Sequence, residues 1–147
     1  MTVEVETDAP SPDRQVWELL MELSMSRMRE RFLTTITELG LSFPQAHALK
    51  VLRPGHPIAM RELAGGLHCD PSNITGIVDR LADRGLVERG SAPGDRRVRT
   101  LMLTEEGTAL RMRLLDRLSE PPPGLGKLSI DEQRQLHHLL RRALLDD

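Results

Sequence analysis

One stretch of the chain, Asp70–Arg99, restricts the fold more than any other. It begins with Asp70-Pro71, a typical helix start, because aspartate caps free backbone N–H groups and proline has none to leave unpaired. Apolar side chains then recur at i, i+3, i+4 and i+7, at positions Ile74, Ile77, Val78 and Leu81. Gly85 ends this pattern, so we predict an amphipathic helix over Pro71–Arg84. Small hydrogen-bonding side chains occupy its other face.

The same stretch continues as two short segments around a turn. Leu86–Arg89 predicts one strand, Ser91–Gly94 a turn and Thr100–Leu103 a returning strand, with arginines concentrated between the turn and the second strand. A helix with a small polar face followed by an arginine-tipped hairpin is the pattern of a winged helix-turn-helix. In that fold the helix enters a major groove and the hairpin reaches the phosphate backbone or the adjacent minor groove.

The residues before Asp70 supply the rest of this fold. Ser42-Phe43-Pro44-Gln45 matches a capping box and predicts a short helix to Leu52. Pro57-Ile58 predicts a minimal strand, and Met60–Leu67 a second short helix. His68-Cys69 is then a tight turn, which completes a helix–turn–helix.

Amphipathic segments flank this unit on both sides. Ser11-Pro12-Asp13 predicts the N-cap and first turn of a helix that runs to Leu39, which is roughly 40 Å long. Thr104 and the capping box at Ser129 predict two further helices. Their apolar faces exceed what one small unit can cover, so we predict a homodimer.

The predicted organisation is therefore a mainly α fold with a small β-hairpin wing (α+β), a winged helix-turn-helix with N- and C-terminal dimerisation helices. Residues 1–10 are predicted to be a flexible acidic tail, and residues 11–40 and 105–147 to be dimerisation helices. Residues 41–104, which we call the reading head, are predicted to form the DNA-binding domain.

The charge distribution agrees with a local DNA contact although the net charge is −2. From Arg84 to Arg99, five arginines against Glu88 and Asp95 give this stretch a formal charge of +3.

The sequence contains few aromatic residues and no segment typical of a membrane or secreted protein. Tyrosine is absent and Trp17, Phe32 and Phe43 are the only aromatic residues, which disfavours RNA or single-strand binding by base stacking. The sequence has no membrane-spanning apolar run and no signal segment, so we expect a cytoplasmic protein.

Ordered motifs between Pro57 and Gly107 support a family resemblance. They are Glu62-Leu63-Ala64, Val78-Asp79-Arg80-Leu81, Arg84-Gly85-Leu86-Val87-Glu88-Arg89, Asp95-Arg96-Arg97 and Leu103-Thr104-x-x-Gly107. In this order and spacing they resemble the MarR family of bacterial transcription regulators. The wing turn departs from the family, which often has Asp-Pro where this chain has Ala92-Pro93.

The resemblance implies a dimer with interlocked terminal helices and one winged helix-turn-helix on each half of a pseudo-palindromic site. It implies that Arg97 enters the minor groove and that Asp95 accompanies it. Many members bind small anionic aromatic ligands between the dimerisation helices and the reading head, so a ligand of this class is the effector that the resemblance implies.

The predicted DNA-binding residues lie on the helix and the hairpin. They are Ser72, Asn73, Thr75, Gly76, Arg80, Arg84, Asp95, Arg96 and Arg97. Asn73 pairs with adenine or caps the helix, and Gly76 removes a side chain where the helix approaches the duplex. Arg80 and Arg84 contact phosphates or form ion pairs within the chain. Asp70 and Asp79 are candidate internal partners for a wing arginine.

We therefore predict a repressor that occupies a palindromic operator, with recognition helices roughly 34 Å apart. The alternative is a winged helix that binds another protein without binding an operator. The sequence shows no nucleophile–base set, phosphate-binding loop or spaced metal ligands, so we predict no enzyme activity, cofactor or metal. The single cysteine, Cys69, is interpreted as part of a turn rather than as a redox sensor or ligand.

Overall fold

The computed structural model describes residues 10–68 and 71–145. Its elements in chain order are α1 (Pro12–Glu22), the π-helical turn η1 (Leu23–Arg27), α2 (Met28–Glu38), α3 (Phe43–Val51), β1 (Ile58–Ala59), α4 (Met60–Leu67), α5 (Pro71–Asp83), β2 (Val87–Ala92), β3 (Asp95–Leu103), α6 (Glu105–Ser119), the 3₁₀ turn η2 (Pro123–Lys127) and α7 (Ile130–Leu144). The predicted mainly α fold with a β-hairpin wing is confirmed. The expected tail, the cap at Asp70 and the turn at Cys69 lie outside the described residues, except for Pro10 at the end of the tail.

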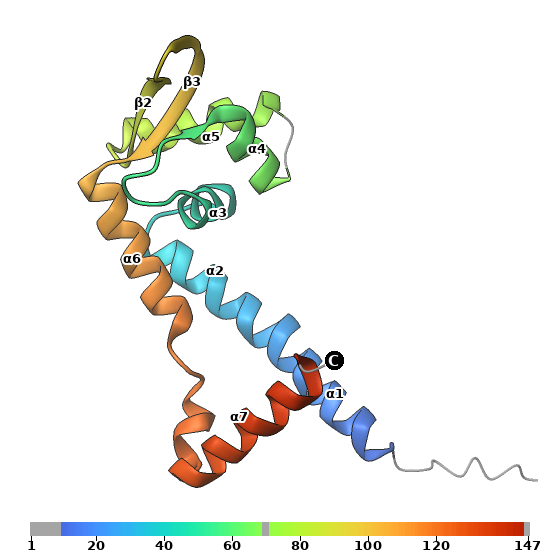
Figure 1. The fold of residues 1–147 in the computed structure, drawn as a ribbon. Helices are drawn as coiled ribbons and strands as arrows, with labels where there is room; N and C mark the ends of the chain where they lie inside the picture. Colours follow the sequence, from blue (N-terminus) through green and yellow to red (C-terminus); the bar gives the residue numbers. More distant parts are fainter. Residues whose placement is uncertain (1–9, 69–70, 146–147) are drawn as a thin grey trace, which may run out of the picture.

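The hydrophobic core lies almost entirely within the reading head. The largest fully buried side chains come from α3, α4, α5, β3 and α6 and the residue after α3: Leu49, Leu52, Leu63, Val78, Leu81, Leu101 and Leu114. Figure 1 shows α3, α4 and α5 gathered beneath the hairpin, which projects from the end of the molecule. This core holds α5 and the hairpin in a fixed relation to each other.

The three strands form one antiparallel sheet in the order β1-β3-β2. Ile58 pairs with Leu101, and Val87 pairs with Leu103 at the base of the hairpin. At the tip Ala92 pairs with Asp95, after a register shift between Ser91 and Ala92. The predicted four-residue turn is therefore wrong in its first half, because Ser91 and Ala92 belong to β2.

Local sequence signals fix most of the element ends. Both capping boxes form, at Ser42 with Gln45 and at Ser129 with Glu132. Thr104 caps α6 by accepting the N–H of Gly107 at 3.0 Å. The predicted cap at Ser11 makes no such bond; its hydroxyl instead donates to Asp13, which lowers the pKa of that carboxyl.

The first segment is one long rod, as predicted, but it is not a single α-helix. In η1 the N–H of Met28 donates to the carbonyl of Leu23, five residues earlier. One extra residue is therefore accommodated between α1 and α2. Figure 1 shows this rod running from the reading head, with α6 leaving the same side of the head.

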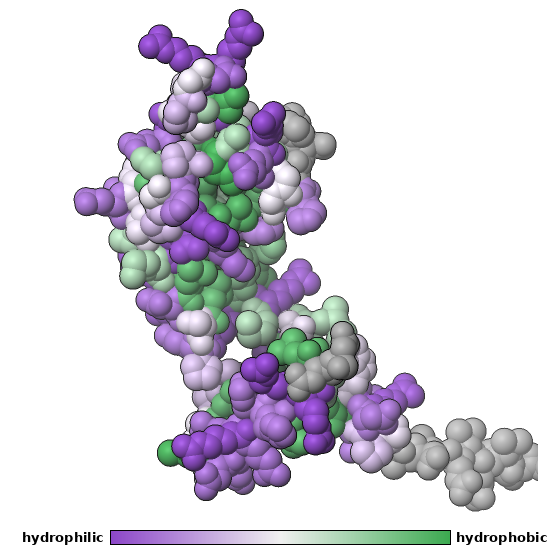
Figure 2. Space-filling view, in the orientation of Figure 1, coloured by the Kyte–Doolittle hydropathy of each residue, from purple (hydrophilic) through white to green (hydrophobic). Residues whose placement is uncertain are grey.

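Large apolar side chains lie exposed on the segments outside the reading head. Neither α1 nor α7 buries a single described residue. Val16, Trp17 and Leu19 are 53%, 57% and 68% exposed. Figure 2 shows green, hydrophobic patches between purple, hydrophilic side chains in the lower half of the molecule, away from the hairpin. In the isolated chain these apolar side chains remain in contact with water, which is unfavourable for a stable monomer.

Candidate nucleic-acid interface

Helix α5 presents the predicted polar face to solvent. Its apolar stripe packs against the core: Ile74 is 3% exposed, Val78 is fully covered and Ile77 is partly buried. Asn73, Thr75, Gly76, Asp79 and Arg80 are exposed on the other side. The side chain of Ser72 lies outside the described part of the structure. The core thus turns a row of small polar side chains outward, where a helix of this kind meets base edges.

Gly76 has no structural explanation within the chain. A Cβ built at this position meets no atom within 4 Å, and the backbone is ordinary helix. A glycine inside a helix costs about 1 kcal/mol relative to alanine. Nothing in the described fold therefore requires a glycine at this position.

The wing places its arginines at the far end of the hairpin. Gly94 adopts a φ of 82° in the turn, and the carboxylate of Asp95 accepts the backbone N–H of Arg97 at 2.9 Å. Asp95 therefore fixes the backbone at Arg97, and the guanidinium of Arg97 takes no part in this hydrogen bond. Arg96 and Arg97 are exposed, and Figure 2 shows hydrophilic side chains covering this tip.

An ion pair joins α5, the predicted recognition helix, to the wing. Arg89 on β2 donates to the carboxylate of Asp79 on α5. The predicted role of Asp79 as partner of a wing arginine is therefore confirmed, with Arg89 as the partner. Both side chains are about half exposed, so the pair contributes little to stability and acts mainly on the relative position of the two elements.

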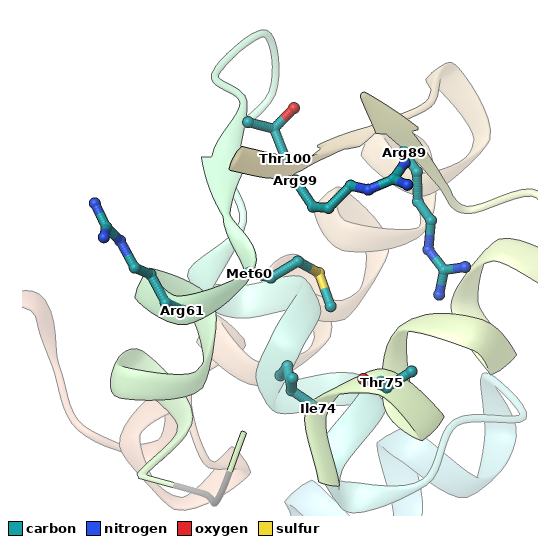
Figure 3. A pocket seen from close by; sticks show the side chains of 7 residues that line it. All are labelled: Met60, Arg61, Ile74, Thr75, Arg89, Arg99 and Thr100. Carbon is teal, nitrogen blue, oxygen red and sulfur yellow. The ribbon is translucent and has the colours of Figure 1, made fainter. Parts of the chain in front are cut away.

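A cleft of about 470 Å³ opens between α4, α5 and the hairpin. Figure 3 shows Met60 at its centre and Arg61 pointing away from it. Its lining residues are Met60, Arg61, Ile74, Thr75, Arg89, Arg99 and Thr100. The sequence pattern indicated no role for Arg61 and no cleft at this place. For Arg99 the alternation of side chains along the strand could have indicated the cleft. Arg99 lies two residues before the buried Leu101 and therefore lies on the same face of the sheet.

The two arginines at the end of the recognition helix differ. Arg80 is exposed and makes no ion pair among the described residues. Arg84 instead donates to the carbonyls of Gly40 at 2.6 Å and Leu39 at 3.3 Å. Of the two roles left open for Arg84, the geometry favours the internal one, with carbonyls rather than a carboxylate as acceptors.

Other kinds of site find no support in the described part of the chain. Residues 10–68 and 71–145 contain no cluster of three or more histidine, cysteine or acidic side chains placed to hold a metal ion. No helix among them combines the length and the apolar character needed to cross a membrane.

Comparison with known proteins agrees with this geometry. The MarR family model matches residues 41–98. The organic hydroperoxide resistance transcriptional regulator of Bacillus subtilis is 26% identical over 85% of this chain and 84% of its own length. The HTH-type transcriptional repressor NicR of Pseudomonas putida is 35% identical over 67% of this chain, which spans only 63% of that repressor.

Solved structures share the fold over nearly the whole chain. The YusO protein of Bacillus subtilis superposes with a TM-score of 0.75 at 25% identity, over 91% of this chain and 97% of YusO. A MepR mutant of S. aureus bound to an oligodeoxyribonucleotide gives a TM-score of 0.72 at 20% identity, over 87% of this chain and 95% of that protein. The family match over the reading head, the regulators related in sequence and the shared fold together show that this chain belongs to the MarR family.

Proposed function

We propose that this chain is a transcription regulator that binds double-stranded DNA in a sequence-specific manner and represses as a homodimer on a pseudo-palindromic operator. The observation that carries this proposal is the outward face of α5, where Gly76 stands in open space beside an arginine-tipped hairpin. A close approach of DNA explains both the missing side chain and the position of the arginines.

Each exposed residue then has a distinct role. Asn73 and Thr75 contact base edges or phosphates from the first turns of α5, and Arg80 contacts a phosphate. Arg97 enters the minor groove, and Asp95 holds the backbone that presents it. Arg96 adds positive charge beside the phosphates. Ser72 remains a candidate at the start of the helix, whereas the exposed guanidinium of Arg84 is hydrogen-bonded to backbone carbonyls of its own chain.

The second copy covers the apolar side chains that α1 and α7 leave exposed. Residues 11–40 and 105–147 serve as dimerisation segments, and residues 41–104 as the reading head. Two heads held at roughly 34 Å reach successive major grooves on one side of the duplex. Because the regulator acts on chromosomal DNA, we place it in the cytoplasm.

A small anionic aromatic molecule is the effector class that fits the chain. The cleft between α4, α5 and the wing lies within the reading head, not beside the dimerisation helices where the resemblance places the effector. It has the volume of a small-molecule site, and it combines apolar Met60 and Ile74 with the cations of Arg89 and Arg99. A ligand there changes the position of the wing relative to α5. A panel of aromatic carboxylates, titrated into the protein–DNA complex, tests this: release should be lost in Arg99→Ala.

The central test is a fluorescence-anisotropy titration over a range of salt concentrations. The wild-type protein should select duplexes from the DNA upstream of its own coding sequence, with affinity that falls steeply as salt rises. Arg97→Ala should weaken binding by roughly 1–3 kcal/mol, while Arg53→Ala, at an exposed arginine between α3 and β1, should leave it unchanged. Absent or salt-independent binding by the wild type contradicts the proposal. Capture of a protein partner that survives Arg97→Ala, without operator binding, supports the alternative of a protein-interaction module.

A further inference from the structure

The end of the recognition helix lies against the end of α2. Arg84 directly follows α5, and its two terminal nitrogens donate to the carbonyls of Leu39 and Gly40, 45 and 44 residues earlier in the chain. Both acceptors directly follow α2. These hydrogen bonds therefore connect the element that faces DNA with the rod that leaves the reading head.

The chemistry of the contact suits a guanidinium. Carbonyls at a helix C-terminus have no partner within the helix and carry a partial negative charge. A guanidinium is planar, permanently charged and able to donate to two acceptors at once, whereas a lysine ammonium is a single point charge. The Arg84 guanidinium therefore binds the end of α2 as a fork, which restricts the angle between the two elements as well as their distance.

The contact falls where the backbone bends after α2. Gly40 has a φ of 64° at the point where the chain leaves α2 for α3, and its carbonyl is the closer of the two acceptors. The apolar side chain of Leu41 is anchored in the core of the head. The hydrogen bond from Arg84 therefore joins the bend at Gly40 to the end of α5.

We propose that Arg84 is a positioning residue that sets the angle of the reading head on α2 and, in the dimer, the spacing between the two recognition helices. The proposal rests on the proposed function, since it requires two heads on one duplex. Helix α5 has 13 residues and is roughly 20 Å long. A tilt of roughly 10° at its Arg84 end moves the other end by roughly 3.5 Å, which is about one base-pair step.

The first experiment measures affinity for duplexes whose half-sites are moved apart or together by one base pair, starting from a duplex that the wild type selects from a random pool. Wild type should prefer the selected spacing by about tenfold or more. Arg84→Ala should lose most of this preference by binding the selected spacing more weakly, and Arg84→Lys should lie between the two. The dependence of affinity on salt should stay unchanged, because no phosphate contact is removed. Arg53→Ala is the matched control.

The second experiment measures the distance between the two heads without DNA. A spin label on Glu88→Cys, in a Cys69→Ser background, reports the distance between the two wings of the dimer by pulsed electron paramagnetic resonance. Wild type should give one narrow distribution, and Arg84→Ala a broader or displaced one. Urea unfolding and sedimentation of each variant show whether the fold and the dimer are retained.

The outcomes separate the two proposals. A wild-type protein that is monomeric or selects no duplex overturns the proposed function itself. A wild-type spacing preference that Arg84→Ala leaves intact overturns only the role of Arg84. Uniform weakening at every spacing with a smaller salt dependence shows a phosphate contact instead, and uniform weakening with reduced stability shows a merely structural role; both overturn the proposal.

Discussion

Replacing Gly76 with alanine separates the stability of this protein from its function. The built Cβ at Gly76 meets no atom within 4 Å, so the new methyl group fits without moving a neighbour. Alanine also restricts the unfolded chain more than glycine does. We therefore expect Gly76→Ala to stabilise the fold by about 0.5–1 kcal/mol, which raises the Tm by about 1–4 °C.

DNA affinity should change in the opposite direction. If α5 lies against the duplex at Gly76, the added methyl group keeps the helix away from its bases and phosphates. The loss of contacts should be roughly 1–3 kcal/mol, which corresponds to roughly 5- to 150-fold weaker binding. Thermal unfolding at one fixed protein concentration and anisotropy titration of a selected duplex measure the two effects on the same preparation.

Gly107 provides a matched control within another helix. Its built Cβ overlaps the carbonyl oxygen of Leu86 and lies 2.8 Å from the carbonyl carbon and 3.2 Å from Leu103 Cδ2. Backbone atoms of Leu86 cannot move aside cheaply, so Gly107→Ala should destabilise the fold by about 3 kcal/mol despite its better helix propensity. Unchanged DNA affinity in Gly76→Ala would refute a close approach of DNA at Gly76, and a lowered Tm would refute the open space.

Three further predictions concern the dimer, the core and pH. Leu19 is 68% exposed, so Leu19→Glu should shift sedimentation from dimer to monomer and abolish operator binding, while Gln15→Glu on the same helix should do neither. Leu81 is fully buried, so Leu81→Ala should lower the free energy of unfolding in urea by about 2–5 kcal/mol; a smaller loss would contradict its place in the core. Hydrogen bonds from Ser129 lower the pKa of Glu132, so the stability from this capping box is present above the ordinary pKa of glutamate and is lost as pH falls through the lowered one. Unfolding curves of Glu132→Gln should lack this part of the acid dependence, and an identical dependence in both proteins would exclude it.

Sequence patterns predicted most of the helices and strands because the interactions that form them are local. The capping boxes at Ser42 and Ser129 each join residues three apart, and both form as predicted. The apolar stripe of α5 follows from the helical period, so its buried side predicts its exposed side. The turn of the wing was predicted less well, because the shift at Ala92 depends on which residue of β3 it pairs with.

By itself, the sequence determined the order of the elements, the buried face of α5 and the arginine-rich hairpin, since helical period, caps and strand alternation act over a few residues. Only the tertiary structure decided which arginine is bonded within the chain. Arg80 and Arg84 lie four residues apart with the same chemistry, yet Arg84 meets carbonyls 44 and 45 residues away, a contact that no local pattern records. Likewise Gly76 and Gly107 are both helix glycines, and only the packing of Leu86 against Gly107 distinguishes a glycine that the fold requires from one beside which a Cβ would meet no atom.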